Sequence, residues 1–96
     1  MLAVPGGIEE DSVTFAPCAK LIDEWVSVTE DEIAAAMVAM LDHHHKVIEG
    51  AAGVALAAFL KTHERYRGRP VAVVLCGSNV GTDVLKAVLA TTKPLA

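Results

Sequence analysis

The sequence predicts an α/β fold in which parallel strands pack against helices. Residues 71–75 form a short apolar run, VAVVL, that is rich in β-branched side chains, and a glycine-containing loop and an amphipathic helix follow it. Hydrophobic residues make up 53 % of the chain, but aromatic residues only 4 %. Hydrophobicity that comes mainly from Ala, Val and Leu is typical of helices packed on a buried parallel sheet. The expected order of strand, helix, helix, strand and helix agrees with that architecture.

The first elements along the chain are expected to be short. Residues 13–15 are predicted to be extended, and residues 18–23 carry a short helical pattern that directs Leu21 and Ile22 inward. Residues 25–28 read as the first of the two strands.

A helix is predicted over residues 30–44. Thr29 and Glu32 have the spacing of a capping box, in which a hydroxyl and a carboxylate each accept a hydrogen bond from an amide at the helix start. The acidic run at residues 30–32 also favours a helix N-terminus. Apolar residues then keep helical spacing as far as His44.

Two more helices are expected. Residues 51–62 are apolar nearly all round, so this helix should be covered on both sides. Residues 82–90 form the last predicted helix, with Thr82 or Asp83 as its cap. Its inner face is expected to carry Val84, Leu85, Val88 and Leu89.

Length and charge exclude several classes of protein. Ninety-six residues allow one small domain or part of a larger one, and a net charge of −4 offers no basic surface for nucleic acid. No segment reaches the roughly 20 continuous apolar residues of a membrane helix. Cys18 and Cys76 match no metal or redox spacing, which favours a reducing cytoplasm. The apolar fraction is high for a small free-standing domain, so we expect the chain to pack against another surface.

Cys76 is the first candidate for a functional group. In open α/β sheets, ligands bind outside the carboxyl ends of the strands, which is where Cys76 would stand. Gly77 and Gly81 permit close approach of the backbone, and the next helix directs its amides to the same region. The loop matches neither the dinucleotide nor the P-loop pattern. Two interpretations stay open: a small buried thiol at a strand end, or a hydrogen-bonding group aimed at a ligand.

Glu49 and the histidine run are further candidates. Glu49 either complements the dipole of the helix that follows it or is a partly buried, functional carboxylate. His43, His44 and His45 suggest a metal cluster, but successive helical residues fan out by about 100° each and cannot share one ion. A solvated helix end, with no metal, is therefore predicted.

Three runs carry a resemblance to a known family. The sequence contains TEDEIAAAM, then HHHKVIEGAAGVALAAFL, then VAVVLCGSNV. These runs resemble the C-terminal part of the threonine/serine dehydratase family, which also contains serine racemase. The resemblance implies a pyridoxal-phosphate enzyme of the tryptophan-synthase-β-like fold (fold type II). It also implies that residues 1–96 are an incomplete piece of the larger, cofactor-binding domain.

The resemblance assigns roles to individual residues. Cys76 takes the position that hydrogen-bonds the pyridine nitrogen of pyridoxal phosphate, and Gly77 follows it in the same motif. Ser78 stands where the family has a second glycine. Asn79 is implied to lie near the nucleotide effector site of serine racemases. Glu49 matches a glutamate of the family that lies close to the cofactor ring.

The family's remaining motifs are not found in this sequence. The Schiff-base lysine motif and the glycine-rich phosphate cradle do not occur in it, so no catalytic residue is assigned and the chain alone is expected to be inactive. The function implied is that of a segment of an ammonia-lyase that deaminates L-threonine or L-serine by β-elimination, with racemisation as a close variant. A complementing N-terminal chain and self-association are expected. The alternative is a non-catalytic α/β module that binds a ligand or a partner chain.

Overall fold

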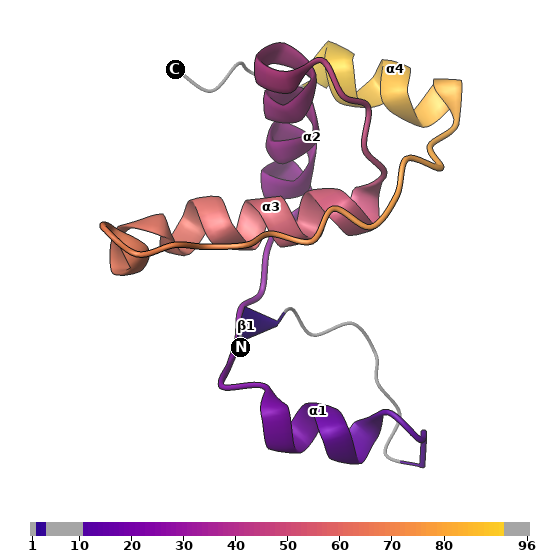
Figure 1. The fold of residues 1–96 in the computed structure, drawn as a ribbon. Helices are drawn as coiled ribbons and strands as arrows, with labels where there is room; N and C mark the ends of the chain where they lie inside the picture. Colours follow the sequence, from indigo (N-terminus) through magenta and orange to yellow (C-terminus); the bar gives the residue numbers. More distant parts are fainter. Residues whose placement is uncertain (1, 4–10, 92–96) are drawn as a thin grey trace.

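Four α-helices and one short pair of parallel strands make up the described part of the chain, which comprises residues 2–3 and 11–91 of this computed structural model (Figure 1). Strands β1 and β2 pair in parallel, with Leu2 opposite Glu24 and Ala3 opposite Trp25. The elements in chain order are β1 (Leu2–Ala3), α1 (Phe15–Leu21), β2 (Glu24–Trp25), α2 (Glu30–His44), α3 (Gly50–Thr62), the 3-10 turn η1 (His63–Tyr66) and α4 (Thr82–Thr91).

Helices α2, α3 and α4 form the core. Helix α2 crosses α3, and α4 packs against α2 (Figure 1). The buried cluster is made by Met37, Met40, Ile48 and Ala52, with Ile33, Leu56, Val80 and Val88 packed around it. The crossing is close because α3 presents Gly53 to α2. A Cβ at this glycine would lie 3.0 Å from Cγ of Met37 and 3.3 Å from the carbonyl oxygen of Ile33.

The predicted start and end of α2 are confirmed. The Thr29 hydroxyl accepts a hydrogen bond from the Glu32 amide at 3.1 Å, and the Glu32 carboxylate accepts one from the Thr29 amide at 3.1 Å. The helix ends at His44 and is followed by the C-cap residue His45, whose φ of 54° lies in the left-handed region. The predicted helices at 51–62 and 82–90 are also confirmed, each extended by one residue. On α4, Leu85 and Val88 are half-buried, whereas Val84 and Leu89 are exposed.

Two expectations for the N-terminal half are wrong. Residues 11–14 form a turn and Phe15 begins α1, so the expected extension at 13–15 is absent. Helix α1 buries none of its residues, and Leu21 is 60 % exposed rather than inward-facing. The strand predicted at 25–28 is reduced to Glu24–Trp25, because its partner β1 is itself only two residues long.

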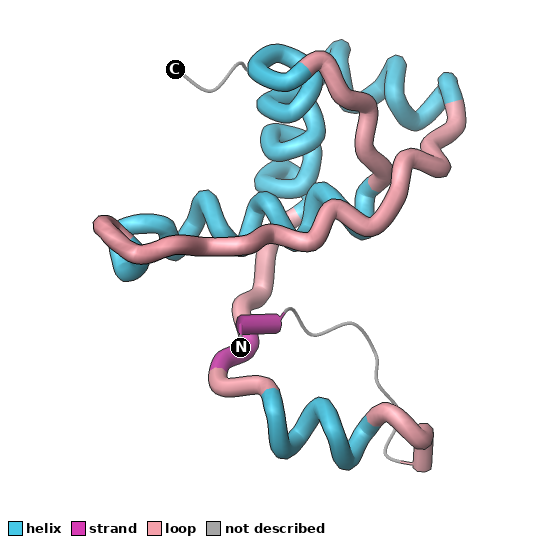
Figure 2. The backbone as a smooth tube through the Cα atoms, in the orientation of Figure 1, coloured by secondary structure: helices cyan, strands magenta, loops and turns pink. Residues whose placement is uncertain are grey.

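The strand predicted at 71–75 is also not formed. These residues run alongside α3 as a loop (Figures 1 and 2), and residues 71–76 make no hydrogen bond to any described residue. A strand is defined by its ladder of hydrogen bonds to a neighbour, and no other described segment lies beside this one in register. The apolar run at residues 71–75 is therefore a loop here and not part of the sheet that its composition predicts.

Two basic side chains, Lys61 and Arg65, tie the N-terminal elements to the helical core. Nζ of Lys61, near the end of α3, donates to the carbonyl oxygen of Ser27 at 2.9 Å and to Oε1 of Glu32 at 3.3 Å. Arg65 in η1 forms an ion pair with Glu24. Within the described ranges, no helix combines the length and the apolar character needed to cross a membrane.

Candidate functional site

The start of α3 and the loop after residues 71–75 meet at one backbone contact. The Glu49 amide donates to the Gly77 carbonyl oxygen at 3.0 Å. Glu49 is the N-cap residue of α3, with extended dihedral angles of −80° and 169°, and its own carbonyl accepts the first helical hydrogen bond from Gly53 at 2.9 Å. The extended conformation turns the Glu49 amide away from the helix and toward the loop.

The Glu49 side chain lies against Gly77. It makes no capping hydrogen bond to the amides of α3. A Cβ at Gly77 would overlap Oε1 of Glu49 and would lie 3.0 Å from its Cδ. The glycine is therefore required by a close approach, and the half-buried Glu49 carboxylate fills the space that a side chain at Gly77 would occupy.

Cys76 directly precedes this junction. Its side chain is exposed and its thiol is free, so the interpretation of Cys76 as a small buried thiol is wrong. The structure thus brings together three of the residues singled out by the sequence: Glu49, Cys76 and Gly77.

Val80 anchors the loop at residues 77–81 to the core, a role that the sequence analysis did not predict. Its side chain packs against the core cluster, and its amide donates to the Ser78 carbonyl oxygen at 2.9 Å. Ser78 and Asn79 are exposed between the two anchored positions, Gly77 and Val80. The sequence feature that could have indicated this role is a single valine among small and polar residues, because such an apolar side chain is often buried.

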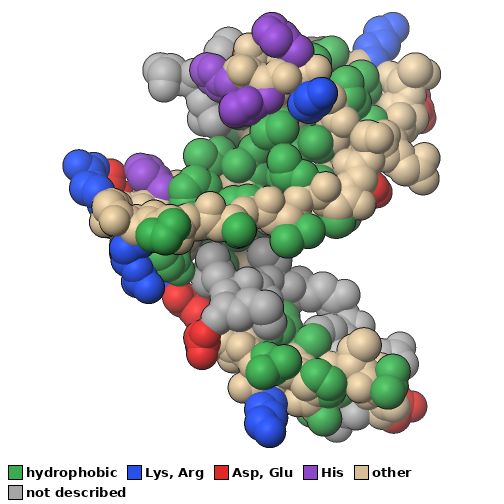
Figure 3. All heavy atoms as spheres, in the orientation of Figure 1, with side chains coloured by type: hydrophobic (Ala, Val, Ile, Leu, Met, Phe, Trp, Pro, Cys, Tyr) green, Lys and Arg blue, Asp and Glu red, His purple; other side chains and the backbone are tan. Residues whose placement is uncertain are grey.

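The histidine run lies away from this junction. His43, His44 and His45 are exposed at the end of α2, where they gather on one surface (Figure 3), so the prediction of a solvated helix end is confirmed. No three His, Cys, Asp or Glu side chains of the described residues are grouped so that they could hold a metal ion.

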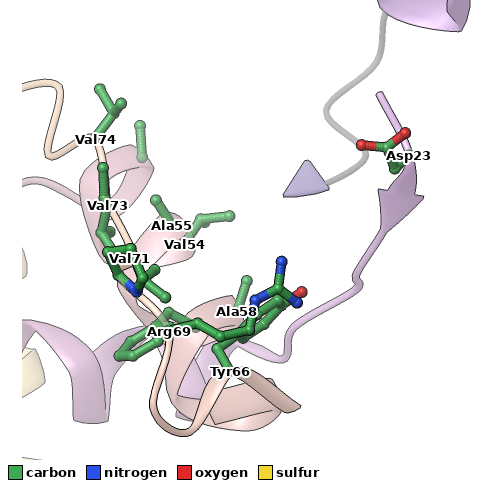
Figure 4. A pocket seen from close by; sticks show the side chains of 13 residues that line it. Asp23, Val54, Ala55, Ala58, Tyr66, Arg69, Val71, Val73 and Val74 are labelled. Atoms are coloured by element: carbon green, nitrogen blue, oxygen red, sulfur yellow. The ribbon is translucent and has the colours of Figure 1, made fainter. Parts of the chain in front are cut away.

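A groove of about 760 Å³ opens on the other flank of α3. Val71, Val73 and Val74 line one side of it, Ala55 and other small side chains of α3 form its floor, and Asp23 stands at its far rim (Figure 4). None of Glu49, Cys76 and Gly77 lines this groove. The groove and the candidate site are thus separate features that share the segment at 71–77.

Comparison with known proteins identifies the family. The model of the family described as "Pyridoxal-phosphate dependent enzyme" matches residues 2–77. That stretch is most of the chain, so the chain belongs to this family.

Two of the relatives within this family are L-threonine ammonia-lyases. The chain is 35 % identical over 77 residues to the L-threonine ammonia-lyase of Thermotoga maritima, which covers 80 % of this chain and 19 % of the relative. It is 37 % identical over 76 residues to the L-threonine ammonia-lyase of Geobacter sulfurreducens, which covers 79 % and 19 %. The chain thus spans about a fifth of the length of the curated relatives it matches.

A solved structure supports the predicted fold class. The processed form of threonine deaminase isoform 2 from Solanum lycopersicum superposes with a TM-score of 0.68 and 32 % identity, over 80 % of this chain and 22 % of that one. The chain is therefore part of a fold type II, tryptophan-synthase-β-like α/β domain, as the sequence predicts.

The family and its ammonia-lyase members imply pyridoxal phosphate as the cofactor. The candidate site suits one part of that group. Cys76 presents an exposed thiol, which is a weak donor, and the contact between Gly77 and Glu49 holds the backbone beside it in place. A weak thiol donor is chemically compatible with the ring nitrogen of that cofactor.

Proposed function

We propose that this chain is a segment of a pyridoxal-phosphate-dependent ammonia-lyase that converts L-threonine, and L-serine, to 2-oxo acids by β-elimination. The observation that supports the proposal is the contact between Glu49 and Gly77, which fixes the backbone next to the exposed thiol of Cys76. The names of the two bacterial relatives, both L-threonine ammonia-lyases, supply the reaction class.

The proposed role of Cys76 follows from the chemistry of its side chain. Pyridoxal phosphate, when bound, acts as an electron sink for the substrate. A carboxylate beside the pyridine nitrogen would hold that nitrogen protonated, whereas a thiol donates only weakly and leaves it neutral. Elimination of water from a β-hydroxy amino acid needs only a brief carbanion, so a mild electron sink suffices.

Other residues of the site have supporting roles in this proposal. Gly77 lets the Glu49 carboxylate lie against the loop, and Val80 fixes the far end of that loop in the core. Asn79 is the candidate contact for a nucleotide effector because it is exposed between these two anchors. The covalent lysine and the phosphate cradle would come from a complementing chain, in the cytoplasm, where Cys18 and Cys76 remain free thiols.

A chimera tests the assignment. Residues 2–77 replace the matching segment of the Thermotoga maritima L-threonine ammonia-lyase, and formation of 2-oxo acid from threonine and serine is measured. We expect a chimera that binds pyridoxal phosphate and deaminates threonine. A folded chimera that lacks the absorbance of bound pyridoxal phosphate would contradict the proposal. Racemised substrate in place of 2-oxo acid would indicate that the segment supports racemisation instead of elimination.

Substitution of Cys76 in the same chimera tests its role. Cys76→Ser should change kcat less than tenfold, because a hydroxyl is also a weak donor to a neutral nitrogen. Cys76→Asp should shift the cofactor's absorbance and lower the rate of elimination by about 10²-fold or more, because a carboxylate protonates the ring. Cys18→Asp, outside the site, is the matched control. Equal rates for all variants would mean that Cys76 does not face the cofactor.

The chain alone is expected to be inactive and to hold no covalent cofactor, since the lysine motif is missing from its sequence. The purified chain is mixed with pyridoxal phosphate, reduced with borohydride and weighed by mass spectrometry. A stoichiometric phosphopyridoxyl adduct on a single lysine would contradict this expectation.

The alternative, a non-catalytic module that binds a partner chain, draws support from the open apolar groove along α3. An apolar surface of this kind also supports the proposal that the chain self-associates.

A further inference from the structure

Glu49 is held by hydrogen bonds on both sides of its Cα. Its amide donates to the Gly77 carbonyl oxygen at 3.0 Å, and its carbonyl oxygen accepts from the Gly53 amide at 2.9 Å. The first bond joins Glu49 to the loop at residues 77–81, and the second belongs to the first turn of α3. The backbone of Glu49 must break a hydrogen bond to move away from either one, so its side chain fills the space between them.

The Glu49 side chain meets Gly77 through its shape. Its carboxylate makes no capping hydrogen bond to α3 and no ion pair among the described residues. A Cβ at residue 77 would overlap Oε1 of Glu49 and would lie 3.0 Å from its Cδ and 3.6 Å from its Cγ. Three atoms of one side chain thus cover the face of Gly77 where any other residue would carry its Cβ.

The loop is also fixed on the other side of Gly77. Val80 packs against the core cluster, and its amide donates to the Ser78 carbonyl oxygen at 2.9 Å. Only residues 78 and 79 separate Gly77 from Val80, so little chain is free to absorb a shift on that side. A displacement of Gly77 away from α3 is therefore passed to the residue before it, Cys76.

We propose that Glu49 is a positioning residue for Cys76: the volume of its side chain, packed against Gly77, sets the distance between the start of α3 and the backbone that carries the thiol. This inference rests on the proposed function, in which the Cys76 thiol is the partner of the cofactor's ring nitrogen. It differs from both roles that the sequence suggests for Glu49, since each of those roles depends on the charge of the carboxylate.

The charge-based roles and the spacing role predict different results. A carboxylate that complements the dipole of α3 acts throughout the first turn and keeps that effect when a methyl group at residue 77 displaces it. A carboxylate that exchanges a proton with a ligand loses its role when its charge is removed, whatever residue stands at position 77. Only the spacing role predicts that changes at residues 49 and 77 compensate each other.

Hydrogen exchange of the residue 49 amide, followed by NMR in the full chain without cofactor, measures the spacing directly. Gly77→Ala should lower the protection factor of this amide at least about tenfold, because the added methyl group pushes the carbonyl oxygen of residue 77 away. Gly77→Ala combined with Glu49→Ala should restore the protection, since the shorter side chain leaves room for the methyl group. Glu49→Gln keeps the volume without the charge and should keep the wild-type protection.

The chimera that carries residues 2–77 tests the consequence for Cys76. Gly77→Ala should shift the absorbance of the bound cofactor and lower kcat by about 10²-fold, because a small displacement of a positioned group is enough for such a loss. Glu49→Ala alone should also lower kcat, since the loop is no longer held at a fixed distance from α3. The double variant should nevertheless exceed Gly77→Ala in kcat by at least about tenfold and return the absorbance toward that of the unsubstituted chimera.

Gly50→Ala is the matched control, because Gly50 adjoins Glu49 and a Cβ there meets no atom within 4 Å. It should change neither the protection of the residue 49 amide nor the absorbance. A double variant no better than Gly77→Ala in either measurement, or a loss of protection in Glu49→Gln, would overturn the spacing role. A chimera that binds no cofactor would refute the proposed function instead, and the exchange measurement, which needs no cofactor, would still decide the spacing.

Discussion

Glu32 shows how one carboxylate can serve two contacts. Its pKa is lowered from the usual value mainly by the hydrogen bond from the Thr29 amide and further by Lys61, while partial burial opposes the shift. A carboxyl whose pKa is lower in the folded chain stabilises that fold at pH values above the unfolded pKa. This contribution disappears as the pH falls through the folded pKa, when the carboxylate is protonated.

We therefore expect the α2 helix to lose stability as the pH falls below about 4.5, the usual carboxyl pKa. The Glu32→Gln variant keeps an oxygen that accepts from the Thr29 amide but cannot titrate, so its stability should change less over the same range. Glu30→Gln removes a charge from the same turn without removing the capping contact and should keep the wild-type pH dependence. The urea midpoint of unfolding is measured by circular dichroism at each pH. If the midpoint changes equally with pH in Glu32→Gln and in the wild type, Glu32 is not the group responsible for the pH dependence.

At the scale of elements, the crossing of α2 and α3 depends on one glycine. Gly53→Ala places a methyl group 3.0 Å from Cγ of Met37 and 3.3 Å from a backbone oxygen that cannot move freely, so α2 and α3 must separate. We expect a loss of about 1–3 kcal/mol in the free energy of unfolding, as for other overpacked sites.

Gly50 is the matched control because it lies in the same helix. A Cβ at Gly50 meets no atom within 4 Å, and alanine suits a helix better than glycine. Gly50→Ala should therefore be neutral or should stabilise the chain by up to about 1 kcal/mol. Urea midpoints again serve as the measurement. Similar destabilisation by both variants would show that close packing of α2 against α3 is not the cause of the lost stability.

The elements also show what a sequence can predict. Helices α2, α3 and α4 were predicted almost to the residue because caps and helical spacing are local signals. The strand at 71–75 was not formed because a strand depends on a neighbour that local sequence does not supply. The same reason limits the site: Cys76 was expected at the carboxyl end of a strand that is not formed, and the contact of Glu49 with Gly77 joins distant segments and came only from the structure.

At the scale of the whole molecule, apolar surface is left open on α3 and on the segment beside it. Burial of apolar surface contributes about 25 cal/mol per Å², while ordering a residue costs about 1–2 kcal/mol of backbone entropy. We expect the isolated chain to unfold in a broad thermal transition, to bind a hydrophobic dye when dilute, and to gain thermal stability with concentration.

Calorimetry, dye fluorescence and size measurement across a concentration series check this expectation. A sharp, cooperative transition of a monomer, independent of concentration, would contradict it. That result would favour the free-standing binding module over the enzyme segment.

The position of Lys61 has a consequence for chemical labelling. Its Nζ donates to the Ser27 carbonyl and to Glu32, and these two contacts hold the group in place, so it must leave them before it can approach an electrophile. Lys46 and Lys86 are exposed and carry no such ties among the described residues. An acylating reagent or a stray aldehyde should therefore modify those two amines well before Lys61. Slow labelling of Lys61 would then indicate that the contact between Lys61 and Ser27, which joins the segment before α2 to the end of α3, is intact.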